Sequence, residues 1–440
     1  MSAEQQFEYQ HEASQERAKP IAWVMLALLF LAYILSLFDR MILALVIEPV
    51  KADLGISDTM ISLLQGLAFV LLYCSLAIPV GRLVDRRPRI PIVAGGVALW
   101  SLMTAVSGMS HQYWLLFLGR VGVGVGESTL SPSTYSLLSN SFPSRQLGIA
   151  TSIFALGASF GAGLALYLGG ALVHWLTLNG AVTLPLVGVL QPWQQAFIIA
   201  GAPGLVLAVL ITLIPEPQRA SGGSSRAPGW GEVGKFFSSN LCWIVPQFLA
   251  VGLSIVVLFG TTSWIIAFFS RVHLWDVQQA GSAAGIANIV GALVGLVCGG
   301  YMSDRLRPAG PHARLYVCSG ALFICALAGA LFPLFDTPEL SAVAWGVVMM
   351  TACIPIGVAG ANLQEMTPER MRGVVSAIYF FVVSLIGIAT GPTIIAIISD
   401  VIFGGDTGIR FSLSVVSGAA SVMAAVGFYL AARAQKKCRC

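Results

Sequence analysis

The chain has 440 residues, of which 57% are hydrophobic and only 10% are charged. Soluble domains carry about 25% charged residues, so most of this surface cannot face water, and the composition excludes a soluble enzyme, a nucleic-acid-binding protein and a disordered scaffold. The 24 basic and 20 acidic residues leave a formal net charge of +4, which becomes informative only when the charges are placed along the chain.

Long apolar stretches run through the chain and predict an all-α integral membrane protein. The first covers residues 21–47, which is more than the ~18 residues needed to cross a bilayer. The segment before it is acidic and Gln-rich, whereas a signal peptide would begin with basic residues. The twelve predicted membrane helices are 21–47, 58–81, 90–109, 113–138, 146–173, 194–214, 241–270, 277–302, 313–333, 340–363, 373–399 and 411–434.

The connectors predict a division into two six-helix halves, 21–214 and 241–434. The connector 215–240 contains Ser221-Gly-Gly-Ser-Ser225 and little apolar surface, which is typical of a flexible linker. Most Lys and Arg residues lie in connectors on the same side as the N-terminus, and this positive-inside pattern predicts that the linker and both termini are cytoplasmic. The tails are predicted at 1–20, disordered, and at 435–440, basic.

Two motifs occur once in each half. Gly81-Arg-Leu-Val-Asp85-Arg86 recurs as Gly300-Tyr-Met-Ser-Asp304-Arg305, and Pro143-Ser-Arg145-Gln-Leu-Gly148 recurs as Pro368-Glu-Arg370-Met-Arg-Gly373 at nearly the same offset. Two such matches indicate a duplication. Parallel six-helix halves with substrate bound at their interface are the architecture of the major facilitator superfamily, so we expect the major facilitator fold with two pseudo-symmetric halves.

The loop 81–89 resembles that superfamily's signature between its second and third helices. The resemblance implies a cytoplasmic gate in which an aspartate meets a helix N-terminus, where a carboxylate is stabilised, and arginines close the cytoplasmic side. The alternative is a positive-inside turn in which a glycine permits a tight bend. The residues assigned to the gate are Gly81, Asp85, Arg86, Arg89, Gly300, Asp304 and Arg305.

Four charged residues are predicted inside the membrane, all in the first half. Asp39 and Arg40 lie in the first span, and Arg120 and Glu127 lie in the fourth. A charge in mid-bilayer costs at least about 2.5–3.5 kcal/mol, so these residues are candidates for function. Asp39 and Arg120 lie at similar depth, which predicts an ion pair between them, with Arg40 directed to a different partner. The alternative is a static ion pair that locks two helices together.

Glu127 lies deeper, past the midplane, and has no obvious partner in the sequence. Burial disfavours the charged form of a carboxyl group, so such a group can load and release a proton during transport. Sodium remains an alternative coupling ion, because Asp39 and nearby hydroxyl groups could coordinate it.

The second half has no comparable charge, and its spans offer aromatic side chains instead. A cavity between the halves would then have one charged wall and one apolar wall, which suits an amphipathic substrate with an anionic or zwitterionic head near Arg40 and Arg120. The alternative is that the aromatic residues face lipid or pack between helices. The residues predicted for the apolar wall are Phe259, Trp264, Phe268, Tyr379 and Phe380.

Other chemistry-bearing patterns are absent from the sequence. The histidines lie in the first tail or at span ends, and none is spaced with cysteines or carboxylates as a metal site. No GxxxxGK[ST] phosphate loop occurs. We therefore expect no metal, no cofactor and no ATP site, and no nucleophile–base pair indicates an enzyme.

The sequence resembles the Spinster family of the major facilitator superfamily, in a bacterial version. The residues that carry the resemblance are Phe38-Asp39-Arg40, Arg120-x-x-x-Gly124-x-Gly126-Glu127, Ser131-Pro132, the loop 81–89 and the motif 368–373. The resemblance implies proton-linked transport of lysophospholipids or sphingosine-1-phosphate-like lipids across a bacterial inner membrane. It implies that Asp39 and Glu127 couple to protons, and that Arg40 and Arg120 serve as headgroup and gate cations.

Two alternative functions use the same residues. A proton-coupled multidrug exporter would share the fold with a less selective cavity. An uncoupled lipid facilitator would keep the four intramembrane charges as structural groups only. For the proton-coupled lipid transporter the expected partners are the bilayer, the amphipathic lipid substrate and protons, with no nucleic acid, and superfamily members usually act as monomers.

Overall fold

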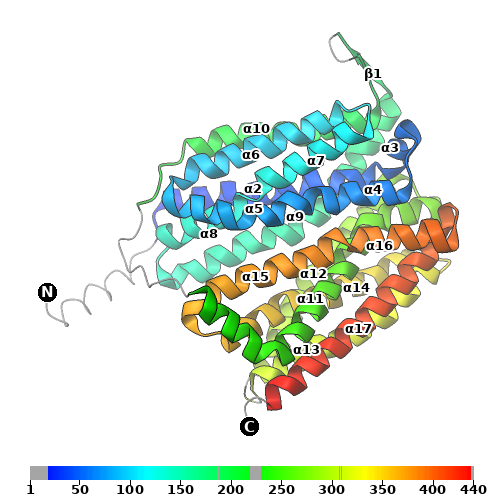
Figure 1. Ribbon diagram of the computed structural model, residues 1–440. Coiled ribbons are helices and arrows are strands. Elements are labelled where there is room, and N and C mark those ends of the chain that lie inside the picture. The colour runs from blue at the N-terminus through cyan, green and yellow to red at the C-terminus, as the bar shows by residue number, and fades with distance from the viewer. Residues whose placement is uncertain (1–17, 186–187, 219–228, 307, 309, 438–440) are drawn as a thin grey trace. The chain divides into compact units, whose positions relative to one another are not determined.

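The computed structural model describes residues 18–185, 188–218, 229–306, 308 and 310–437, and nearly all of them are helical (Figure 1). The described residues form two compact units. Unit 1 comprises the chain up to Ile42, Leu72–Ala165 and the described part of Gly180–Gly223. Unit 2 comprises Leu43–Leu71, Leu166–Asn179 and the described part of Ser224–Cys440.

Unit 1 contains helices from the first half of the sequence. Its central packing joins α6 to α7 and α10, which run side by side in Figure 1. Gly96 and Gly126 permit the close approach of α6 and α7, because a Cβ on Gly126 would lie 2.6 Å from the main-chain oxygen of Gly96. The helices are α2 (Pro20–Leu45, to Ile42), α5 (Leu67–Arg86, from Leu72), α6 (Arg89–Gly108), α7 (Tyr113–Glu127), α8 (Leu130–Ser141), α9 (Ser144–Asn179, to Ala165) and α10 (Pro192–Thr212).

Unit 2 contains the second half of the sequence and two short segments of the first. Its main helix pairs are α13 with α17, α11 with α17 and α12 with α14. Two π-helical segments, Leu385–Ala389 and Ile398–Phe403, flank α16. The helices are α3 (Ile47–Leu54), α4 (Asp58–Gln65), α11 (Trp230–His273), α12 (Val277–Leu306), α13 (Pro311–Leu331), α14 (Pro338–Met366), α15 (Arg372–Ser384), α16 (Gly391–Ile397) and α17 (Ile409–Lys437).

The predicted membrane helices are present, and three of them are interrupted. The span 373–399 is divided at Thr390, between the π-helical segment Leu385–Ala389 and α16. In the described part of the chain, eleven helices are long and apolar enough to cross a membrane. The remaining predicted span, 113–138, is divided into α7 and α8 at Ser128-Thr129, directly after Glu127. The predicted second span is divided at Gly66, where a Cβ would lie 2.7 Å from the main-chain oxygen of Ala389. Glycine is therefore needed at that close approach.

The linker predicted at 215–240 is only partly a linker. Residues 219–228 of this linker lie outside the described residues. The same is true of most of the predicted N-terminal tail 1–20 and of residues 438–440 in the predicted C-terminal tail 435–440. On one side, Glu216 and Pro217 are held by hydrogen bonds to Arg89. On the other, α11 begins at Trp230, so residues 230–240 are helical. A short hairpin, β1 (Val182–Leu184) with β2 (Gly188–Leu190), was not predicted.

Candidate functional site

All four intramembrane charges lie in unit 1, on α2 and α7. Asp39, Arg120 and Glu127 are each at most 2% exposed, whereas the side chain of Arg40 keeps 11% exposure. Their formal charges sum to zero. The cluster is therefore buried and neutral overall, and Arg40 is its most exposed member.

Arg40 and Glu127 form an ion pair. The Nε of Arg40 donates to Glu127 Oε2 at 2.7 Å, and Nη2 donates to the same oxygen. Ser36, one turn earlier on α2, donates its hydroxyl to this oxygen at 3.1 Å. The guanidinium group also lies over the ring of Tyr73, 5.1 Å from its centroid. The expectation that Glu127 has no partner is therefore wrong.

The predicted ion pair between Asp39 and Arg120 is not formed. Arg120 Nη1 instead donates to the main-chain oxygen of Asp39 at 2.9 Å, and no salt bridge joins the two side chains in the described structure. Asp39 Oδ1 and Arg120 Nε are buried and have no hydrogen-bond partner there. The similar depth of the two residues correctly predicted that they lie close together. Depth does not give the direction of the Asp39 side chain, so the ion pair was predicted wrongly. Within the described residues Asp39 therefore forms no salt bridge, although the Arg120 guanidinium contacts its main chain, whereas Glu127 is paired through Oε2 and leaves its Oε1 without a hydrogen-bond partner.

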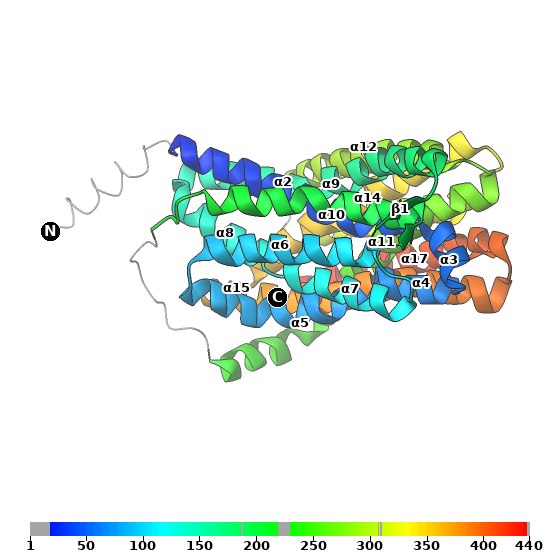
Figure 2. The same cartoon turned by 90° about the horizontal axis from the view of Figure 1, so that it is seen from above.

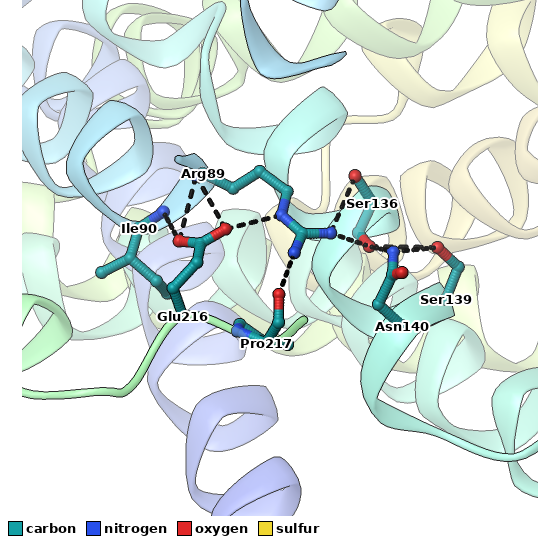
Figure 3. A network of polar contacts seen from close by, with 7 residues as sticks. All are labelled: Arg89, Ile90, Ser136, Ser139, Asn140, Glu216 and Pro217. Carbon is teal, nitrogen blue, oxygen red and sulfur yellow. Dashed lines mark hydrogen bonds and ion pairs between the residues drawn. The ribbon is translucent and has the colours of Figure 1, made fainter. Parts of the chain in front are cut away.

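The segment 81–89, predicted as a loop, is helical up to Arg86, and Arg89 is the first residue of α6. Arg89 is the centre of a second polar network (Figure 3). Arg89 is 1% exposed, and its Nε donates to Glu216 Oε1 at 2.8 Å. Its Nη1 donates to the main-chain oxygen of Ser136 at 3.1 Å, and its Nη2 donates to that of Pro217. The main-chain N–H groups of Arg89 and Ile90 also donate to the Glu216 carboxylate, at 3.0 and 2.8 Å.

Glu216 thus stabilises the N-terminus of α6, where the helix dipole and the unpaired N–H groups favour an anion. Burial acts to raise the pKa of Glu216, but the hydrogen bonds from Arg89 and Ile90 outweigh it and hold that pKa below its ordinary value. Glu216 was not among the residues predicted from the sequence. The available signal was its position between Pro215 and Pro217, directly after the sixth span.

The other residues assigned to the gate lie at helix ends. Asp85 and Arg86 are exposed in the last turn of α5. Gly300, Asp304 and Arg305 are exposed near the end of α12, where the Arg305 guanidinium lies 4.9 Å from the centroid of the Tyr301 ring. Gly81 is half-buried, and a Cβ there would meet open space.

The five aromatic residues predicted for an apolar wall lie in unit 2 and differ in exposure. Trp264 and Phe268 are fully buried within this unit, where the Trp264 indole N–H donates to the main-chain oxygen of Pro392 at 3.0 Å. Tyr379 is 3% exposed, Phe259 is half-buried and Phe380 is 62% exposed. Trp264 and Phe268 therefore pack between helices, which is the alternative to a cavity wall that the sequence left open.

A further charged cluster lies in unit 2 and was not predicted. Arg271 donates to both carboxylate oxygens of Asp58, at 2.5 and 2.9 Å, and its Nε donates to Glu48 at 2.7 Å. Lys51 Nζ lies 2.5 Å from Asp58 Oδ1. The side chains of Asp58 and Arg271 are each 4% exposed. These contacts join α3 and α4, from the first half of the sequence, to the end of α11.

Comparisons with known proteins identify relatives along most of the chain. The sequence profile of the Major Facilitator Superfamily matches residues 29–392. The chain is 25% identical to an MFS-type efflux pump of Mycolicibacterium smegmatis, over 86% of this chain and 85% of the pump. It is 30% identical to protein spinster homolog 1 of Mus musculus, over 85% and 73%. It is 25% identical to the sphingosine-1-phosphate transporter SPNS2 of Danio rerio, over 83% and 74%.

Among solved structures, the fold is similar to that of a bacterial homolog of the human lysosomal transporter Spinster, in an inward-facing and unoccupied conformation. The TM-score is 0.84 at 24% sequence identity, and the match covers 96% of this chain and 98% of that one. At this identity the likeness concerns the fold alone, and it agrees with the major facilitator fold predicted from the sequence.

Proposed function

Because the chain belongs to the major facilitator superfamily and is a Spinster-type multi-pass transporter of the bacterial inner membrane, we propose that it moves an amphipathic, anionic lipid together with protons. The substrate class is a lysophospholipid or a sphingosine-1-phosphate-like lipid. Transport occurs by alternating access of the two predicted six-helix halves, as in a rocker switch.

The ion pair between Arg40 and Glu127 carries this proposal. Arg40 is the partly exposed member of the pair, and a guanidinium group binds phosphate oxygens through two parallel hydrogen bonds. A lipid phosphate that binds Arg40 competes with Glu127 for the same N–H groups. Glu127, still buried, then loses its counter-ion and takes up a proton, because burial disfavours an unpaired carboxylate. The headgroup and the proton therefore bind together.

Asp39 and Arg120 provide a second step in the same cluster. Asp39 has a buried carboxylate oxygen without a hydrogen-bond partner, and Arg120 has a buried Nε in the same situation. A small rotation of either side chain would convert the contact with the Asp39 main chain into an ion pair. We assign Asp39 as the second proton-coupling carboxylate and Arg120 as the cation that responds to its charge.

The names of the relatives support the substrate class, since one is called a sphingosine-1-phosphate transporter. A second candidate function is drug efflux, which the mycobacterial efflux pump favours. A basic, partly exposed residue such as Arg40 suits an anionic or zwitterionic headgroup. Broad export of unrelated cationic compounds would therefore favour the second candidate over the first.

The decisive experiment is flux in proteoliposomes without sodium, measured with labelled lysophospholipid and sphingosine-1-phosphate in the presence and absence of an imposed pH gradient. We expect gradient-driven accumulation by the wild type. Glu127→Gln should retain lipid binding and lose the response to the gradient. Glu369→Gln, at an exposed carboxylate outside the cluster, is the matched control and should behave as the wild type.

Three outcomes would contradict the proposal. Flux that ignores both the gradient and the Glu127→Gln substitution would indicate an uncoupled facilitator. Gradient-driven flux that survives in Glu127→Gln would remove Glu127 from the coupling step. Absence of lipid flux, combined with export of cationic drugs, would assign the protein to the efflux class.

A further inference from the structure

A long apolar groove runs along unit 2 between α12 and α14, which lie side by side in Figure 2. Its volume is about 480 Å³. Ile286, Val290 and Val294 form one wall at four-residue spacing and are 41–55% exposed. Val343 and Met350 contribute to the opposite wall. Side chains this apolar and this exposed face lipid in a membrane-spanning helix.

The groove exists because the backbones of α12 and α14 touch beneath it. A Cβ on Gly291 would lie 2.6 Å from the main-chain oxygen of Gly346, and a Cβ on Gly295 would lie 2.0 Å from that of Met350. Small residues allow membrane helices to approach closely. The larger side chains on either side of this contact therefore stand above a shallow floor.

The end of the groove at which both helices begin is polar and acidic. Glu339, in the first turn of α14, lines the groove and is exposed. In the described structure its side chain forms no salt bridge or hydrogen bond. Trp275 lines the same end and stacks on Phe269, with ring centroids 4.9 Å apart. Tryptophan at a span end is typical of the membrane–water interface.

Among the described residues at this end, the two arginines are already paired with other carboxylates. Arg271 is engaged by Asp58 and Glu48, and Arg410 is engaged by Asp336. Asp276, next to Trp275, accepts a hydrogen bond from the main chain of Gln279 and adds a further negative charge. His273 is a further titratable group near Glu339, and its ring nitrogen Nε2 is in hydrogen-bond contact with the hydroxyl group of Ser341.

We propose that this groove binds one acyl chain of a phospholipid whose headgroup carries a primary ammonium group, as in phosphatidylethanolamine, and that Glu339 accepts hydrogen bonds from this ammonium. The length supports one chain of one leaflet. Residues 339 to 350 span about 16 Å at ~1.5 Å per residue, and half of a ~30 Å hydrocarbon core is about 15 Å. The proposal does not depend on the transported substrate.

The test is lipid retention by the full-length protein. The protein is purified from, or exchanged into, mixed micelles of detergent with equal amounts of phosphatidylethanolamine and phosphatidylglycerol, and the bound lipids are counted by native mass spectrometry. We expect one phosphatidylethanolamine to remain at detergent concentrations that remove the anionic lipid. Glu339→Gln should lower its retention at least several-fold, because the amide has no charge to pair with the ammonium.

Two further variants distinguish lipid that is lost from this groove from lipid that is lost from the protein in general. Val290→Trp places a bulky ring at an exposed wall position and should expel the acyl chain. Leu249→Trp is the matched control, since Leu249 is similarly exposed in a second apolar groove of unit 2, between α11 and α17, whose lining has no charged residue. That variant should retain the lipid as the wild type does.

The proposal is overturned if Glu339→Gln retains phosphatidylethanolamine as well as the wild type, or if phosphatidylglycerol is retained equally. It is also overturned if the wild type is a dimer that the Val290→Trp substitution dissociates, because a second copy of the chain would then occupy the groove. Glu339→Gln changes an exposed side chain, so its result stands even if Val290→Trp fails to fold.

Discussion

The anchoring of Glu216 to the N-terminus of α6 allows a quantitative test of unit 1. Glu216→Ala removes the acceptor of three interactions: two main-chain N–H groups and the side chain of Arg89. Removing one partner of a buried ion pair costs about 3–5 kcal/mol. The Glu216 side chain is 32% exposed and Arg89 keeps two main-chain acceptors, so we expect a loss of about 2 kcal/mol, below that range.

The assay is the free energy of unfolding in detergent micelles titrated with a denaturing detergent. Glu369→Ala is the control, because its ion pair with Arg372 is exposed and spans 3.7 Å, and such pairs contribute at most about 1 kcal/mol. A double-mutant cycle with Arg89→Met isolates the coupling between Arg89 and Glu216. If Glu216→Ala costs no more than the control, the network does not stabilise unit 1 and the reasoning fails.

The same carboxylate predicts a pH dependence. Burial acts to raise the pKa of Glu216, but the hydrogen bonds from Arg89 and Ile90 outweigh burial and hold this pKa below its ordinary value. The ordinary value is about 4.3 in an unfolded chain. A group with a lowered folded-state pKa stabilises the protein above the unfolded value, and this contribution is lost as the pH falls through the folded pKa. The stability difference between wild type and Glu216→Ala should therefore be constant near neutral pH and decrease below about pH 4. A difference that grows in acid would contradict the assignment.

Three further substitutions test other parts of the structure. Asp58→Asn leaves Arg271 buried with a weaker acceptor, and we expect a loss of about 3 kcal/mol in the same unfolding assay; a loss below 1 kcal/mol would show that the pair is not structural. Gly295→Ala places a Cβ 2.0 Å from a main-chain oxygen of α14, so we expect poor folding, measured as loss of monodisperse protein, whereas Gly300→Ala, where there is open space, should be neutral. Arg40→Lys keeps the charge but not the two-pronged geometry, so phosphate-bearing lipids should bind at least several-fold more weakly in an equilibrium binding assay; unchanged affinity would remove Arg40 from the headgroup site.

The four candidate functional residues inside the membrane could be identified from the sequence because of their position alone. A charge in an apolar stretch is unusual whatever the helix packs against, so Asp39, Arg40, Arg120 and Glu127 could be identified without a structure. Which of them contact one another could not be predicted from the sequence. Successive residues on a helix point about 100° apart, and the rotation of α2 relative to α7 decides whether Arg40 or Asp39 faces Glu127. The structure selects Arg40.

Glu216 illustrates a second kind of limit. It is distant from Arg89 in the sequence and looked like part of a flexible linker, since Pro215 and Pro217 flank it and the polar segment 219–228 follows. Only the packing of α6 beside α10 brings it to the first turn of α6. The same holds for Asp58, at the start of the predicted span 58–81, and Arg271, directly after the predicted span 241–270. The packing of α4 and α11 in unit 2 joins them.

The sequence by itself determined that this is a multi-span helical membrane protein of the major facilitator type, because apolar length, helix period and motif repetition are local properties. Tertiary structure alone decided where three spans are interrupted, at Gly66, at Ser128-Thr129 and at Thr390, and which charges pair. Those outcomes depend on distances of a few ångströms between segments far apart in the chain. Hydrogen bonds and ion pairs change with such distances, whereas the hydrophobic effect that selects the spans does not.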